Sequence, residues 1–137
     1  MTLHYLVAPF LSWMGAGLLK FLVNSFKAKR LAFNESGNGG FPSSHTAIVS
    51  SVAALVAMEE GIAHPAFGVS LALTLIVILD ANGLRQQVGA HAELINDLVP
   101  GEEPQDQVRE RMGHTRFEIA GGTAIGILTS TAIHFLK

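Results

Sequence analysis

The chain has 137 residues, of which 49% are hydrophobic and 15% charged, with a formal net charge of −2 and a mean hydropathy of +0.38. Soluble globular domains carry about 25% charged residues, so this chain has too few charges to cover a water-facing surface. Its length fits a single domain, 1–137. The small net charge gives no reason to expect a nucleic-acid partner, and the absence of cysteine excludes disulfides and thiolate metal sites.

Four apolar stretches indicate helices, and no strand-like alternation of useful length occurs, so the sequence predicts an all-α fold. The stretches are 3–26, 46–58, 62–79 and 119–136. A membrane span needs roughly 20 mostly apolar residues, and the second stretch is the shortest of the four. We therefore expect an integral membrane bundle of about four apolar helices. The alternative is a soluble bundle with an unusually large apolar content.

The polar part of the chain lies between the third and fourth stretches. Residues 86–99 place apolar side chains at helical spacing, which predicts a short amphipathic surface helix. A loop punctuated by proline and glycine follows at 99–107, and then a short basic run that closes on Gly113.

Four spans place the first and third connections on one side of the membrane, and the second connection with both termini on the other. The second connection, 58–65, contains no lysine or arginine. The positive-inside rule therefore assigns the basic side to the cytoplasmic face of the cell (inner) membrane. The cations and histidines of the basic side are Lys27, Lys29, Arg30, His45, Arg85, His91, Arg109, Arg111, His114 and Arg116.

The stretch GNGGFPSSH, 37–45, leads directly into an apolar helix. One interpretation is structural: Gly39 and Gly40 allow a tight turn, and Ser43 or Ser44 caps the helix. The other is a phosphate cradle, in which the same helix start offers N–H groups and hydroxyls while His45 donates a proton to a leaving oxygen. This stretch alone supports both interpretations equally.

Two further blocks carry titratable groups. In GHTRFE, His114 and Glu118 are four residues apart, so the carboxylate can fix the tautomer of the imidazole and leave its other nitrogen as a nucleophile; the alternative is an ordinary surface pair. In LDANGLR, Arg85 follows an expected turn at 82–83, and its guanidinium can bind two oxygens of a phosphate at once. Asp80 either orients Arg85 or caps the turn. Lys20, inside an apolar stretch, is a functional candidate unless it only snorkels to the surface.

These blocks, in this order, resemble the three-part signature of the type-2 phosphatidic acid phosphatase superfamily, which also includes the vanadium haloperoxidases. GGFPSSH, DANGLR and GHTRFE are similar in particular to its small divergent membrane branch. The resemblance covers about residues 15–130 and implies a helical bundle that hydrolyses phosphomonoesters through a phosphohistidine. No cofactor or metal is implied.

The resemblance also implies a role for each matching residue. His114 would be the nucleophile, Glu118 its orienting carboxylate and His45 the general acid. The phosphoryl oxygens would be held by Lys20, Arg85, Ser43 and Ser44.

The chain departs from the superfamily pattern at several positions. Ser44 replaces a glycine, Lys27-Ala28 stands where Arg-Pro is expected, and Glu118 replaces an aspartate. Arg85 and His114 lie 29 residues apart, farther than the superfamily keeps them. His91 fits the spacing better, but the residue four positions later is not a carboxylate, so we assign the nucleophile to His114.

The sequence thus predicts a membrane phosphatase acting on a lipid phosphate, either phosphatidate-like or isoprenoid. The main alternative is a non-catalytic binder or transporter of phosphorylated lipids that uses the same cationic pocket. Haloperoxidase activity and a purely structural membrane protein are further alternatives. The spacing of Gly122 and Gly126 permits close helix packing and, with it, a homo-oligomer.

Overall fold

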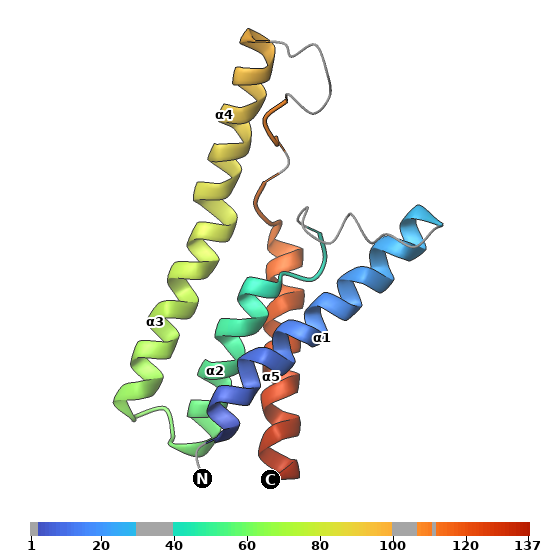
Figure 1. The fold of residues 1–137 in the computed structure, drawn as a ribbon. Coiled ribbons are helices and arrows are strands. Elements are labelled where there is room, and N and C mark those ends of the chain that lie inside the picture. The colour runs from blue at the N-terminus through green and yellow to red at the C-terminus, as the bar shows by residue number, and fades with distance from the viewer. Residues whose placement is uncertain (1–2, 30–39, 100–106, 111) are drawn as a thin grey trace.

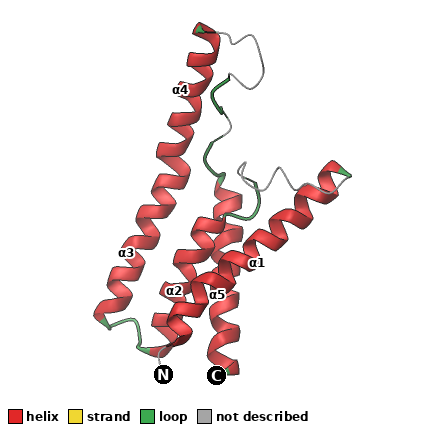
Figure 2. Cartoon of the chain, viewed as in Figure 1, coloured by secondary structure: helices red, strands yellow, loops and turns green. Residues whose placement is uncertain are grey.

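The computed structural model describes residues 3–29, 40–99, 107–110 and 112–137, and these residues form helices and connecting loops with no strand (Figures 1 and 2). The all-α prediction is therefore confirmed for the part of the chain that the structure describes. The elements are α1 (Leu3–Ala28), α2 (Ser44–Glu59), α3 (Pro65–Leu79), the π-helical turn η2 (Asp80–Leu84), α4 (Arg85–Leu98) and α5 (Arg116–Leu136).

Helix α2 is the centre of the bundle, because α1, α3 and α5 all pack against it. Both ends of the chain and the α2–α3 connection lie at one end of the molecule, whereas α2 and α5 begin toward the other end (Figure 1). This arrangement agrees with the expected topology of the connections.

Among the described residues, three helical segments are long and apolar enough to cross a membrane: Leu3–Ala28, Pro65–Leu98 and Arg116–Leu136. The expectation of about four apolar helices is correct, but α2 has only 16 residues and is not among these candidate spans. The short helix is instead enclosed by the three longer ones.

The expected turn at 82–83 is wrong, because the chain stays helical there. The amphipathic helix expected at 86–99 is present as α4, but it continues α3 without a break. Helices α3 and α4 form one continuous segment that passes through η2 (Figure 1). An isolated Asn-Gly pair inside a helix can be accommodated as a π-helical turn rather than a break. The 34-residue segment is roughly 50 Å long, which exceeds the roughly 30 Å hydrocarbon core of a bilayer. One end of it must therefore project beyond that core.

The interior consists mainly of small and hydroxyl-bearing residues, while most of the large apolar side chains point outward. Ala16, Ala47 and Ser51 are fully buried, whereas Phe10 and Leu128 are each 68% exposed. A soluble bundle has the opposite distribution. Small residues inside and large apolar residues outside are typical of helices that pack within lipid.

Helices α2 and α5 are in close contact along Gly122 and Gly126. A Cβ atom at Gly122 would collide with the backbone oxygen of Ser43, and one at Gly126 would collide with Ser50. Farther along the same contact, the Ser130 hydroxyl donates to the backbone oxygen of Ser51 at 2.6 Å. The two glycines therefore let the backbones approach closely enough to fix the start of α2 against α5.

We predict that Gly122→Ala destabilises the fold by about 1–3 kcal/mol, because the added methyl group overpacks a contact that has no room for it. Gly68→Ala is the matched control, since only the adjoining backbone of α3 lies within 4 Å of a Cβ at that position. It should leave stability unchanged or raise it slightly, because alanine favours helix more than glycine does. The unfolding midpoint in detergent, followed by fluorescence-detected size-exclusion chromatography, measures both. Equal midpoints for the two variants would contradict the prediction.

Candidate functional site

Two histidines from distant parts of the chain lie next to each other. His45 is in the first turn of α2, and His114 comes directly before the N-cap residue of α5. Their ring centroids are 6.3 Å apart. The His45 side chain is exposed, whereas His114 is only 6% exposed. One imidazole is thus fixed inside the protein, and the other is open to an incoming ligand.

His114 is held in place through its backbone. Its N–H donates to the carbonyl of Ala81 in η2 at 2.9 Å, and its own carbonyl accepts from the Gln86 amide at 3.1 Å. The preceding residue, Gly113, has a φ of +87°, and a Cβ there would crowd both Ala81 and Gln86. Glycine is therefore required for the chain to approach the η2 turn this closely.

The π-helical turn explains why the Ala81 carbonyl can accept this hydrogen bond. In an α-helix this carbonyl would accept from the N–H of Arg85, four residues later. Here the Arg85 N–H bonds to the carbonyl of Asp80 instead. The widened turn leaves the Ala81 carbonyl available, and the loop that carries His114 uses it.

Glu118 contacts His114 as the spacing predicted, but with different local structure. The Nδ1 atom of His114 lies 3.3 Å from Oε2 of Glu118. His114 is not on the helix, however, because Thr115 is the N-cap residue of α5 and forms a capping box with Glu118. The same carboxylate oxygen accepts the Thr115 N–H at 2.9 Å. The Glu118 side chain thus caps the start of α5 and also orients the imidazole of His114.

At the start of α2 the two serines have different surroundings. Ser43 is fully buried and is the N-cap residue, with its hydroxyl accepting from the Thr46 N–H at 3.4 Å. Its own N–H donates to the carbonyl of Glu118 at 2.9 Å, which joins the two blocks directly. Ser44 is only partly buried and lines a pocket. Of the two expected turn glycines, Gly40 has a φ of +93°, and Gly39 lies outside the described residues.

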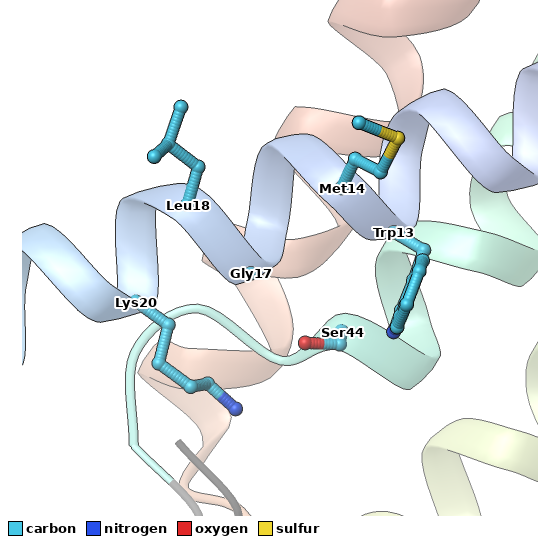
Figure 3. Close-up of a pocket in the computed structure, with 6 residues that line it drawn as sticks. All are labelled: Trp13, Met14, Gly17, Leu18, Lys20 and Ser44. Carbon is cyan, nitrogen blue, oxygen red and sulfur yellow. The ribbon is translucent and has the colours of Figure 1, made fainter. Parts of the chain in front are cut away.

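The expected cations differ in how they are held. Nε of Arg85 donates to Oδ2 of Asp80 at 2.7 Å, so Asp80 orients the arginine rather than capping a turn. Asp80 and Arg85 are five positions apart in the sequence, and the widened turn brings their side chains together. Lys20 is 6% exposed, and its side chain points into the space between α1 and the start of α2, as Figure 3 shows. It lines the same pocket as Ser44.

Burial lowers the pKa of His114 below its ordinary value of 6.5, and the hydrogen bond that its ring donates to the Glu118 carboxylate acts in the opposite direction. Partial desolvation also lowers the pKa of His45, and the positive charges of Arg85 and Lys20 lower it further. Both rings are therefore predominantly neutral at pH 7 when no anion is bound. A phosphate placed among these cations would favour the protonated form of His45.

Two of the other expected candidates, His91 and Lys27, are exposed residues away from this cluster. His91 is exposed on α4, six residues and roughly 9 Å beyond Arg85 along the helix. Lys27 is exposed near the end of α1. Arg30 and Arg111 lie outside the described residues.

Sequence reasoning missed several contributors to the site. The T-x-x-E pattern at Thr115 and Glu118 is a recognisable capping-box signal and would have placed the start of α5 correctly. Gln86 and the Ala81 carbonyl carried no such signal, because their role depends on the π-helical turn. Trp13 and Met14 line a pocket together with Lys20, but the sequence indicated only that they belong to an apolar span.

Comparisons with known proteins identify a family and a relative. The family model described as "Divergent PAP2 family" matches residues 1–129. A protein of Bacillus subtilis (strain 168) named "Uncharacterized membrane protein YuiD" is 31% identical, and the match covers 73% of each chain. No solved structure matches the chain.

We predict that the pKa of His114 lies below 6.5 and falls further in Glu118→Gln. Glutamine keeps the capping box but removes the charge that favours the imidazolium. Glu93→Gln, an exposed position on α4, is the matched control and should leave this pKa unchanged. Histidine-labelled protein titrated by NMR, with the His114 signal assigned from His114→Asn, measures it. A value of 6.5 or above, or a rise in Glu118→Gln, would contradict the prediction.

Proposed function

The chain belongs to the Divergent PAP2 family, and from this premise we propose that it is a membrane phosphatase that hydrolyses a lipid phosphate monoester. The observation that carries the proposal is the juxtaposition of His45 and His114, with ring centroids 6.3 Å apart. A nucleophile about 3 Å from phosphorus and a proton donor about 3 Å from the leaving oxygen fit a separation of this order.

In the first step of the proposed reaction, Nε2 of His114 attacks phosphorus, and the bond from phosphorus to the lipid oxygen breaks. His45 gives its proton to that oxygen, so the lipid leaves as a neutral alcohol. In the second step His45 takes a proton from water, which attacks the phosphohistidine. Inorganic phosphate leaves, and both rings return to their starting states.

Glu118 and the cations support these steps. With Nδ1 bonded to the Glu118 carboxylate at 3.3 Å, the lone pair of Nε2 is available, and the positive charge that develops on the ring is balanced. Phosphoryl transfer depends mainly on positioning and on neutralising charge on the equatorial oxygens. Lys20, Arg85 and the positive end of the α2 dipole supply that charge.

We place the protein in the cell membrane with this site at the cytoplasmic face. The second connection has no lysine or arginine, and the site cations lie toward the opposite end of the bundle. A site at that boundary receives water and phosphate from one side and a lipid tail from the other. Phosphatidate-like and isoprenoid phosphates both have this chemistry.

A second candidate function is binding or transport of phosphorylated lipids without hydrolysis. Two observations favour it: His114 is 6% exposed, and Arg85 is already paired with Asp80 at 2.7 Å. A site that only holds phosphate needs no exposed nucleophile.

Phosphate release from a panel of lipid phosphates separates the two functions. We predict turnover by the wild type, a loss of at least about 1000-fold in His114→Ala, and a loss of about 100- to 10,000-fold in His45→Ala. His91→Ala is the matched control and should retain wild-type turnover within about twofold. Binding without turnover in the wild type would favour the carrier, and turnover lost only in His91→Ala would overturn the assignment of His114.

We also predict a bell-shaped profile of kcat/KM with its maximum on the acidic side of 6.5. His114 must be neutral to attack and His45 protonated to donate, and the pKa of each is lowered in the free protein. The profile of kcat reports the enzyme–substrate complex, in which bound phosphate raises the pKa of His45. The alkaline limb of the kcat profile should therefore lie at higher pH than that of the kcat/KM profile. Initial rates from pH 4 to 9 test this, and a flat kcat/KM profile would refute both assignments.

A further inference from the structure

A pocket of about 430 Å³ lies on the face of α1 next to the candidate site. Its volume is in the range of small-molecule sites. Lys20 and Ser44 belong both to this pocket and to the candidate phosphate site, so the two spaces are continuous. The remaining lining residues are Trp13, Met14, Gly17 and Leu18, and Figure 3 shows all six.

Gly17 is at the centre of the hollow. On a helix, the residues three and four positions before it and three after it share its face, and these are Trp13, Met14 and Lys20. Apart from the adjoining backbone of its own helix, no atom lies within 4 Å of a Cβ at Gly17. Unlike Gly122 and Gly126, this glycine is therefore not explained by close packing of another helix. It leaves open space between larger side chains.

The walls of the pocket are apolar and accessible from the lipid. Trp13, Met14 and Leu18 are 54%, 60% and 63% exposed, on a helix long and apolar enough to span the membrane. Trp13 is seven residues before Lys20, so the hollow extends roughly 10 Å along α1 away from the cationic end. That direction leads toward the middle of the span.

We propose that this hollow binds the first carbons of the hydrocarbon chain of the substrate, with Gly17 as the residue that admits it. The inference rests on the proposed function and deepens it, because it names where the tail lies and what selects it. When a phosphate is held between Lys20 and Ser44, its ester oxygen lies beside the apolar walls of the pocket. The occupant is a single alkyl or prenyl chain attached to that oxygen.

Chain length should therefore raise kcat/KM until the hollow is filled. Each methylene transferred from water to an apolar site contributes roughly a three- to fourfold factor. Leucine at position 17 would occupy the hollow and remove the part of this gain that the hollow contributes. Gly68→Leu is the matched control, because it makes the same substitution in α3, where a Cβ also meets open space.

The test compares kcat/KM for dodecyl phosphate and butyl phosphate in nanodiscs of one fixed phosphatidylcholine composition. Partition of dodecyl phosphate into the bilayer is the same for all variants and cancels between them. We expect the dodecyl-to-butyl ratio to fall at least about tenfold in Gly17→Leu and to stay within about twofold of wild type in Gly68→Leu. A wild-type ratio in Gly17→Leu, or an equal fall in both variants, would overturn the inference.

Thermal stabilisation distinguishes failure of this inference from failure of the proposed function. If the wild type releases no phosphate, dodecyl phosphate should still raise its unfolding midpoint more than butyl phosphate does. Loss of that difference in Gly17→Leu alone supports the tail site in a carrier. The same difference in wild type and Gly17→Leu overturns the tail site whether or not the protein is an enzyme.

Discussion

The hydrogen bond from the His114 N–H to the Ala81 carbonyl determines the geometry of the candidate site. It joins the start of α5 to the long α3–α4 segment, and it exists because the π-helical turn redirects the Arg85 N–H to Asp80. The same turn brings the Asp80 and Arg85 side chains together. One local widening of a helix thus positions both a histidine and an arginine, which agrees with the frequent occurrence of such turns at functional sites.

The second constraint is the close contact between α2 and α5. Gly122 lets the backbone of Ser43 approach α5, and the Ser43 N–H then bonds to the Glu118 carbonyl. His45 and His114 belong to these two helix starts, so the spacing of their rings follows from backbone contacts. Such backbone contacts fix the separation of the two rings more tightly than contacts between flexible side chains would, because close-packed interiors deform little.

Much of this organisation could be predicted from the sequence. The apolar stretches located the helices, the Ser43 cap was one of two interpretations of the serine pair, and the spacing of His114 and Glu118 indicated their contact. The continuous α3–α4 segment could not be predicted, because an Asn-Gly pair favours a turn in isolation. The 29-residue separation of Arg85 and His114 is bridged by backbone hydrogen bonds, which leave no pattern in side chains. The pocket at Gly17 depends on how α1 crosses α2.

The anchor of His114 is a main-chain carbonyl, and this has a consequence for how such chains can diverge. Ala81 is buried, and replacing it with another small residue leaves the main-chain carbonyl in the same position. An insertion or deletion within 80–84 would instead rotate everything that follows by about 100° per residue and remove the acceptor. Homologous sites of this kind are therefore better recognised by helical register than by residue identity.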